Sequence, residues 1–337
     1  MAKGLNIYIK GDGIAARCCA HLLRRAGAKV FGDGVASARV PAMMLSPLAI
    51  SLMRDVFTAP ALFSNVFEIE RRYVTWGATE RTAIPHASAV ISEGALLAAV
   101  PPPWDGDQQI APEECDFTIH AALPLPDGKP RQRFGAREAA TARIRLKDSD
   151  GRACEIESVG DGWLFLIPTA EAAWLLAVGG PVETLLAASR QIGPRVEIEA
   201  GGGEFDCAPG MAEAVQGEHW MACGPVAVGF DPICGDGTAH AVREAILAAA
   251  VIAGIARGED RRALLSHYRA VLTLAMGRHL DLCADYYRSG GDSPWWRDQG
   301  DALARGRAWC EARMQSAGPR MYRLQDFDLL PLTAGAA

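Results

Sequence analysis

The sequence predicts an α/β fold, and three observations predict it. Residues 5–10 alternate apolar and polar side chains like a short strand, and two glycines lead from them into an Ala- and Leu-rich helix at 14–25. Residues 141–198 are a succession of short strand-like segments between turn residues, which is typical of an antiparallel sheet. Beyond residue 238 the pattern is helical. The expected architecture is therefore a strand–turn–helix unit, an inserted mixed or antiparallel sheet, and a helical C-terminal segment.

The turn after the first strand has the spacing Gly11-x-Gly13-x-x-Ala16. In a Rossmann-like dinucleotide site each small residue has a physical role. Gly11 permits the tight turn, Gly13 lets the backbone approach a pyrophosphate, and Ala16 lets helix and strand pack closely. The helix N-terminus, at Ile14 and Ala15, supplies free N–H groups and positive potential. The alternative is an ordinary strand–helix turn that happens to contain two glycines.

Two residues after this helix are further candidates for the same site. Dinucleotide folds place an acidic residue at the end of the second strand, here residues 28–31, where it binds a ribose hydroxyl. Asp33 is the candidate, about one residue earlier than the usual spacing. Arg39 is a candidate for a phosphate contact, and an exposed loop arginine is the alternative reading.

Composition excludes several classes of function. The 337 residues can hold one large domain or two ordinary ones. A net charge of −6 without a dominant basic stretch argues against nucleic acid as a partner. The most apolar stretch, 239–255, is interrupted by charged residues, so we expect no membrane span. The nine cysteines lack metal-like or disulfide-like spacing, and no secretion signal pattern is present. We expect a cytoplasmic, reduced protein.

Periodicity predicts the remaining elements. Pro47 and the apolar spacing behind it suit the first turn of a helix within 43–57. Further helices are expected at 88–100, 181–192, 239–257, 260–290 and 295–314. Further strands are expected within 64–76 and at 116–121, 141–146, 153–158, 162–167, 174–177 and 196–198.

These elements predict three regions. Residues 1–140 and 219–290 form a discontinuous nucleotide-binding domain. Residues 141–218, with part of 60–85, form the sheet of a substrate domain. Residues 291–337 form a helical cap and a tail, whose last five residues are expected to be disordered.

A second glycine-rich segment opens the long helix, and it reads Asp231-Pro232-Ile233-Cys234-Gly235-Asp236-Gly237-Thr238. Together with the N-terminal turn and the segment Gly162-Trp163-Leu164-Phe165-Leu166-Ile167-Pro168, it resembles the flavoproteins that include para-hydroxybenzoate hydroxylase-type monooxygenases and flavin-dependent halogenases. The resemblance implies a Rossmann-like FAD-binding fold in which the second segment lies at the flavin. The implied cofactor-binding residues are Gly11, Gly13, Ile14, Ala15, Ala16, Asp33, Arg39, Asp231, Pro232, Gly235, Asp236, Gly237 and Thr238.

The sequence departs from this group at three places. Pro225 stands where members carry an Asp that binds the ribityl chain, and Phe165 stands at the second Trp of the halogenase Trp-x-Trp-x-Ile-Pro signature. Halogenases also use a lysine after the second strand, and this chain has none between Lys29 and Lys129. The resemblance therefore favours hydroxylation through a flavin hydroperoxide over halogenation.

We expect an FAD-dependent monooxygenase that hydroxylates an aromatic substrate. The substrate is a small molecule or a protein-bound side chain, such as a tryptophan modified during quinone-cofactor maturation. Electrons come from NAD(P)H directly or through a separate flavin reductase. Candidate bases are His86, His120, His219 and His240, and candidate pocket aromatics are Trp163, Phe165 and Trp220, although core packing is the alternative for each.

Two rival interpretations remain. The first is a flavin-dependent reductase or dehydrogenase of the geranylgeranyl-reductase type, which saturates bonds without inserting oxygen. The second is a non-catalytic flavin-binding interaction protein, consistent with Pro225 and the irregular position of Asp33.

Overall fold

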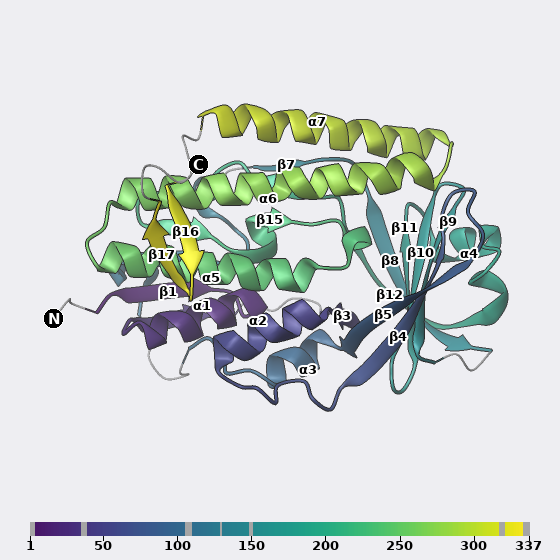
Figure 1. The fold of residues 1–337 in the computed structure, drawn as a ribbon, viewed down its shortest axis with the longest axis horizontal. Coiled ribbons are helices and arrows are strands. Elements are labelled where there is room, and N and C mark those ends of the chain that lie inside the picture. The colour runs from purple at the N-terminus through teal and green to yellow at the C-terminus, as the bar shows by residue number, and fades with distance from the viewer. Residues whose placement is uncertain are drawn as a thin grey trace.

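The computed structural model describes residues 4–34, 39–104, 110–128, 130–147, 151–316 and 321–332. It shows a mixed α/β molecule with a parallel sheet, a larger mixed sheet and a helical C-terminal part (Figure 1). The predicted fold class is confirmed. Lys129 and the predicted tail at 333–337 lie outside the described residues.

The parallel sheet, sheet A, carries the N-terminal turn. Its order is β14-β6-β1-β2, and every neighbouring pair is parallel. Ile7 and Ile9 are fully buried, as expected for a strand in the middle of a parallel sheet. The carboxyl ends of parallel strands share one edge, so the glycine turn lies on that edge. The strands are β1 (Asn6–Lys10), β2 (Lys29–Asp33), β6 (Phe117–His120) and β14 (Trp220–Ala222).

The larger sheet, sheet B, has eight strands in the order β12-β8-β11-β10-β9-β4-β5-β3. The β4–β9 pair is parallel and the other pairs are antiparallel, so the sheet is mixed. Its strands come from two separate parts of the chain. They are β3 (Met43–Leu45), β4 (Phe67–Thr75), β5 (Thr82–Ile91), β8 (Glu138–Leu146), β9 (Ala153–Val159), β10 (Gly162–Pro168), β11 (Ala173–Val178) and β12 (Val196–Asp206).

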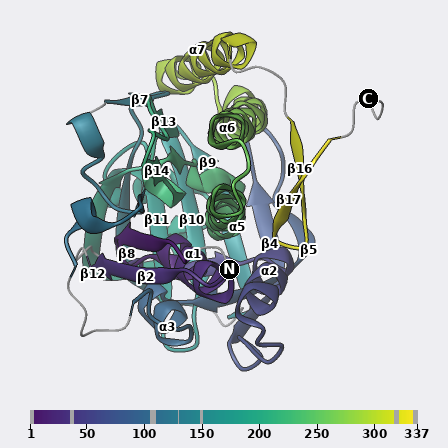
Figure 2. The ribbon, with the colours of Figure 1, turned by 90° about the vertical axis from the view of Figure 1, so that its left-hand side faces the viewer.

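Helices surround one apolar helix, α5 (Gly237–Ala256), which packs against α1 (Ile14–Arg25), α2 (Pro47–Phe57) and α6 (Arg261–Gly290). By length and composition alone α5 is apolar enough to cross a membrane, but most of it is buried inside the protein. It is the core helix of this half of the molecule. Helix α7 (Pro294–Ser316) lies along α6 on the outside (Figures 1 and 2).

The remaining elements are short. They are α3 (Glu93–Ala98), α4 (Val182–Ala188), β7 (Arg131–Arg133), β13 (Gly210–Ala212), β15 (Val228–Gly229), β16 (Tyr322–Gln325), β17 (Asp328–Pro331) and the 3-10 turns η1 (Pro112–Glu114), η2 (Pro126–Gly128), η3 (Gly193–Arg195), η4 (Gly224–Val226) and η5 (Pro232–Cys234).

Two predicted helices are shorter than expected. The prediction of a helix over 88–100 is wrong at its start, because β5 continues to Ile91 and pairs with β3; only α3, capped by Ser92, is helical. The prediction over 181–192 fails at its end. After α4 the chain turns around the buried carboxylate of Glu157, which accepts hydrogen bonds from the N–H groups of residues 190–192.

Candidate functional site

The N-terminal turn has a geometry that requires glycine at its first position. Gly11 has φ +110°, and a Cβ there would lie 2.9 Å from Cβ of Ala122. Its N–H donates to the carbonyl oxygen of Asp33 at 2.9 Å, which ties the turn to the end of β2. The turn is therefore fixed by backbone contacts at the carboxyl edge of sheet A.

Gly13 has a different environment. It precedes α1 in an extended conformation, and a Cβ built on it would meet no atom within 4 Å among the described residues. No described side chain caps α1 either, so its first N–H groups have no side-chain partner among the described residues. This is the geometry that a phosphate group needs. Ala15 and Ala16 are buried instead, and a Cβ on Gly224 would lie 2.8 Å from Cβ of Ala15, so these two alanines serve helix packing.

Charged side chains surround the turn. The carboxylate of Asp12 lies 2.8 Å from the guanidinium of Arg17 and 3.4 Å from that of Arg39. Arg39 also lies 3.7 Å from a carboxylate oxygen of Glu93. The structure thus places Arg39 beside the glycine turn, where its charge is shared between two carboxylates. Sequence reasoning did not single out Asp12 or Arg17.

Asp33 ends β2 on the same edge as the turn, next to Lys10 in the register, and it is exposed. Its carboxylate is also close to Tyr8: burial, and then the charge of Asp33 and a hydrogen bond to it, raise the pKa of the Tyr8 hydroxyl. The structure therefore brings Asp33 to the edge where its predicted role requires it to lie.

The second glycine segment forms an open loop before α5. Gly235 has φ +66°, and α5 begins at Gly237, where a Cβ would meet no described atom within 4 Å. The Asp236 side chain does not cap the helix. Instead it accepts from the Ser46 hydroxyl at 3.3 Å and pairs with Arg243 at 3.3 Å. The N–H groups at the start of α5, near Thr238, are thus left to face the space in front of the loop.

Asp231 and Pro232 lie beneath this loop, and Asp231 is almost fully buried. One carboxylate oxygen of Asp231 lies 2.9 Å from Nε of Arg137 and accepts from the Tyr287 hydroxyl at 2.9 Å; the other accepts from the N–H of Ile233. Burial raises the pKa of Asp231, and the charge of Arg137 opposes that rise. The Asp231 carboxylate is therefore bound by groups of the protein and stabilises the loop from its buried side.

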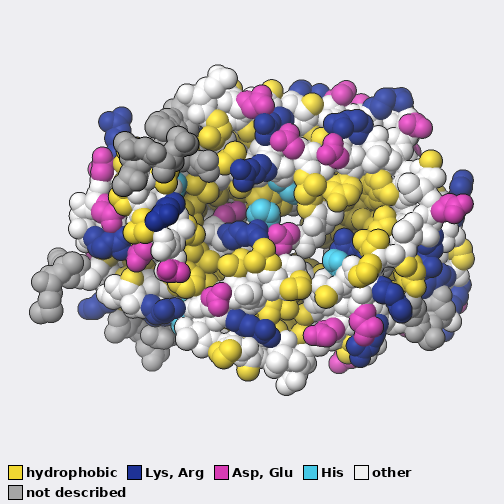
Figure 3. Space-filling view, viewed as in Figure 1, with side chains coloured by type: hydrophobic (Ala, Val, Ile, Leu, Met, Phe, Trp, Pro, Cys, Tyr) yellow, Lys and Arg dark blue, Asp and Glu magenta, His cyan; other side chains and the backbone are white. Residues whose placement is uncertain are grey.

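Helices α1 and α5, which follow the two glycine segments, pack against each other. Both begin on the side that faces sheet B and run away from that sheet in the same direction (Figure 1). Seen from the same side, the surface is hollowed where α5 begins, and hydrophobic, charged and histidine side chains surround the hollow (Figure 3). Two further cavities, of about 570 and 400 Å³, are not lined by residues of either glycine segment.

Sheet B supplies the opposite wall through a cluster on adjacent strands. Nη2 of Arg72 on β4 lies 3.0 Å from Nε2 of His86 on β5, and the Ser88 hydroxyl lies 2.8 Å from the same nitrogen. The Arg72 guanidinium lies 5.6 Å from the ring centre of Phe165 and 3.8 Å from the position of a Cβ on Gly235. Its buried Nε has no hydrogen-bond partner among the described residues.

The protonation of this cluster follows from its contacts. Burial and then the charge of Arg72 lower the pKa of His86 to about 4, so the imidazole is neutral at pH 7. A guanidinium has only donors, so Nε2 of His86 accepts and Nδ1 carries the proton. Arg72 is thus held as a cation beside the loop. Sequence reasoning named His86 but missed Arg72 and Ser88.

The other histidine and aromatic candidates lie in different parts of the molecule. His240, in the first turn of α5, stacks on Phe230 with ring centres 4.1 Å apart. His219 is exposed and precedes β14, at the edge of sheet A opposite the glycine turn. His120 and Trp220 pack against each other on that sheet, and Trp163 is fully buried, where it donates to the Tyr287 hydroxyl at 3.2 Å. Of the three aromatic candidates, the structure places only Phe165 beside the second glycine segment, through Arg72.

No family model matches the chain, and no curated protein matches it in sequence. Solved structures do match in fold. The flavin-dependent halogenase CmlS is 17% identical with a TM-score of 0.74, over 94% of this chain and 72% of that one. QhpG, a peptidyl tryptophan dihydroxylase essential for tryptophylquinone cofactor biogenesis, is 17% identical with a TM-score of 0.64, over 88% and 79%.

A third match is 2,6-dihydroxypyridine-3-hydroxylase from Arthrobacter nicotinovorans, 14% identical with a TM-score of 0.62, over 87% of this chain and 95% of that one. The chain has the fold of the flavin-dependent halogenases and hydroxylases. Within this fold, two observations fit an FAD site: the open space at Gly13 and Gly237, and the starts of α1 and α5 without a described side-chain cap.

Proposed function

We propose that the protein is an FAD-dependent monooxygenase that hydroxylates an aromatic substrate. One observation carries this proposal: two neighbouring helices, α1 and α5, each begin without a described side-chain cap at a glycine with open space beside it, and Arg72 of sheet B lies next to Gly235 of the second segment.

The proposed cofactor contacts follow from that geometry. Gly13, the start of α1 and Arg39 would hold the pyrophosphate of FAD, and Asp33 at the end of β2 would bind the ribose. The backbone of Gly235 and Gly237 would hold the flavin ring, where the positive end of α5 favours negative charge. Pro225 has no side-chain donor or acceptor for the ribityl chain, so its contacts come from backbone or from other side chains.

A reduced flavin supplies the activation of molecular oxygen. The chain's own residues must exclude water and orient the substrate. Phe165, which lies beside Arg72, and Phe230, which stacks on His240, are the proposed sources of apolar surface. Arg72, which can only donate, provides a hydrogen bond and a positive charge to an oxygen or nitrogen of the aromatic substrate. His86 fixes Arg72 and stays neutral.

The substrate is an aromatic small molecule or a protein-bound aromatic side chain. The second class, a tryptophan in a protein substrate during quinone-cofactor maturation, is supported by the likeness to QhpG. Hydroxylation is favoured over halogenation by the absence of lysine from residues 30–128. We further propose NAD(P)H or a separate flavin reductase as the source of electrons, and the cytoplasm as the location, in keeping with nine free cysteines.

Flavin binding is the first test. The purified protein, or the protein titrated with FAD, should show flavin absorbance that NAD(P)H with or without a reductase bleaches and air restores. A protein that binds no flavin would instead support the interaction-protein reading. Flavin that is reduced and passes its electrons to an unsaturated bond without consuming oxygen would support the reductase reading.

A further inference from the structure

Two pairs of cysteines lie in thiol contact, and they differ in burial. Sγ of Cys234 lies 3.6 Å from Sγ of Cys283, and Sγ of Cys19 lies 3.8 Å from Sγ of Cys223. Cys19 and Cys223 are both fully buried. Cys234 is half-buried, so solutes reach one member of the first pair.

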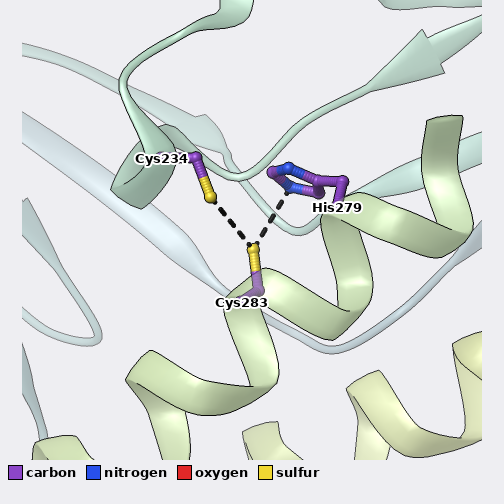
Figure 4. A group of neighbouring side chains, drawn as sticks. All are labelled: Cys234, His279 and Cys283. Carbon is purple, nitrogen blue, oxygen red and sulfur yellow. Dashed lines mark hydrogen bonds between the residues drawn. The ribbon is translucent and has the colours of Figure 1, made fainter.

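The first pair joins two elements at the second glycine segment (Figure 4). Cys234 ends η5, directly before Gly235, and Cys283 lies on α6, one turn after His279. Sγ of Cys283 lies 3.3 Å from Nε2 of His279. A covalent bond between the two sulfurs would therefore tie the loop before Gly235 to helix α6.

The same three side chains resemble a metal-binding set, because their ligand atoms all lie within 4.8 Å of one another. The histidine argues against that reading. The backbone N–H of Asp231 donates to Nε2 of His279 at 2.8 Å, so the lone pair that a metal would need is already engaged. Without the histidine only two protein ligands remain, whereas zinc sites use three or four. The cluster therefore offers a dithiol.

We propose that Cys234 and Cys283 are a redox-active pair that hydrogen peroxide converts into a disulfide. The Cys234 thiol releases its proton and the thiolate attacks one peroxide oxygen; the O–O bond breaks, the departing hydroxide takes up that proton, and Cys234 sulfenic acid and water form. The Cys283 sulfur then attacks the Cys234 sulfur, and the hydroxyl leaves with the thiol proton as a second water. Two thiols lose two electrons and two protons, and the peroxide is reduced to two waters. A dithiol reductant reverses the change by thiol–disulfide exchange.

The order of attack follows from burial. Cys234 is accessible and meets the peroxide, whereas burial raises the pKa of the Cys283 thiol and keeps it protonated until the sulfenic acid forms beside it. Bond formation shortens the sulfur separation from 3.6 Å to about 2 Å, which displaces the loop before Gly235. This last step rests on the proposed function, in which this loop contacts the flavin. The disulfide then weakens FAD binding.

The test is disulfide mapping of the full chain. The protein is treated with hydrogen peroxide, alkylated in denaturant, digested without reductant and analysed by mass spectrometry. The expected result is a cross-linked peptide that contains Cys234 and Cys283, about 2 Da lighter than the two free peptides together. Cys19 and Cys223, at almost the same separation but without access, should be recovered alkylated and serve as the internal control.

Two variants sharpen the result. In Cys283→Ser the sulfenic acid has no partner, so dimedone should label Cys234 after peroxide, whereas Cys19→Ser should leave the Cys234–Cys283 cross-link intact. Recovery of Cys234 and Cys283 as separate alkylated peptides overturns the proposal, and so does equal oxidation of both pairs. Stoichiometric zinc that is bound by the wild type and lost from Cys283→Ser overturns it in favour of a metal site.

The consequence for the cofactor is measured separately. FAD titration of the reduced and the oxidised protein should show weaker binding after oxidation, restored by dithiothreitol. If the reduced protein binds no FAD, the proposed function fails while the mapped disulfide stands. If both forms bind FAD equally, the disulfide has no effect on the loop, and the coupling is refuted while the flavin site stands.

Discussion

Nη2 of Arg72 lies 3.0 Å from Nε2 of His86, and the same guanidinium lies 3.8 Å from where a Cβ on Gly235 would be. Arg72 therefore connects sheet B with the loop before α5. Because the neutral histidine can only accept there, the arginine is oriented without losing its charge. A cation is thus fixed at the boundary between the proposed flavin site and the substrate side of the hollow.

Arg72→Ala should lower kcat with a bound aromatic substrate by about tenfold or more, the loss expected for a charge-assisted hydrogen bond. FAD affinity should change little, because none of the proposed cofactor contacts is made by Arg72. Removing the guanidinium should also raise the pKa of His86 from about 4 toward its ordinary value, measured by NMR titration of the imidazole.

Arg71→Ala is the matched control, since successive side chains of a strand point to opposite faces. It should leave both kcat and the pKa of His86 close to wild type. An Arg72→Ala enzyme with unchanged kcat would remove Arg72 from the site, whereas an unchanged His86 pKa would contradict the contact itself.

Gly13→Val should abolish FAD binding and leave the fold intact. The added side chain enters open space in this structure, so it meets no protein atom, but it obstructs the approach of a pyrophosphate to the start of α1. Gly300→Val is the control, because Gly300 is also open to a Cβ and lies on the outer helix α7. Absorbance of bound flavin and circular dichroism measure both properties. Wild-type flavin content in folded Gly13→Val protein would exclude the N-terminal site.

Gly237→Asp separates helix stability from cofactor binding. A carboxylate in the first turn of α5 interacts favourably with the helix dipole, so the variant should be as stable as wild type or more stable, by about 0.3–1 kcal/mol. FAD binding should nevertheless be weakened strongly, since the added charge and bulk lie where the ring approaches the backbone. Fluorescence titration and thermal unfolding measure the two effects. If affinity is retained, the isoalloxazine ring does not lie at this loop.

The parts of this site that were predictable are local in sequence. The spacing of Gly11, Gly13 and Ala16 marks a strand–turn–helix unit, and Gly235 and Gly237 mark the loop before α5, because turn and capping constraints act over a few residues. The strand at residues 88–91 was mistaken for helix. A short apolar run is ambiguous between the two periods, and its pairing with β3, more than forty residues earlier, decided the outcome.

What was not predictable depends on pairings between distant segments. The Arg72–His86 contact requires the register of β4 with β5, and the burial of Asp231 requires Arg137, which lies before β8, and Tyr287 on α6. The family resemblance placed Asp231 with the cofactor ligands, as part of the second glycine segment. The structure gives its carboxylate three partners within the protein.

His279 predicts a loss of stability in acid. Burial, then the charges of His240 and Arg137, lower its pKa to about 3, below the ordinary value near 6.5. A lowered folded-state pKa contributes stability that is complete above pH 6.5 and lost as pH falls toward 3. The contribution of His279 to the free energy of unfolding should fall by about 2 kcal/mol between pH 7 and pH 5.

His279→Gln isolates this contribution, because the amide oxygen of glutamine can accept from the N–H of Asp231 without titrating. Urea unfolding at both pH values measures it. The variant should lose less stability than wild type, by about the same 2 kcal/mol. Parallel losses in the two proteins would show that His279 is not the group that titrates.

The last prediction separates hydroxylation from halogenation, which flavin binding alone cannot do. A hydroxylase holds the aromatic ring directly against the activated oxygen in a near-attack geometry. A halogenase, by the resemblance, needs a lysine that this chain lacks over residues 30–128, and arginine is a poor substitute because its guanidinium stays protonated and strongly delocalised. Arg72 therefore orients a substrate and does not replace that lysine.

Turnover with reduced flavin, ¹⁸O-labelled O₂ and a panel of phenols, indoles and tryptophan-containing proteins should give a product that carries label from O₂. Added bromide or chloride should not be incorporated, and Arg72→Lys should not create incorporation, because a hydroxylase geometry keeps the ring next to the flavin. Mass spectrometry of the product decides between the chemistries. A halogenated product, or product oxygen that comes only from water, would refute the monooxygenase assignment even if every flavin-binding prediction above held.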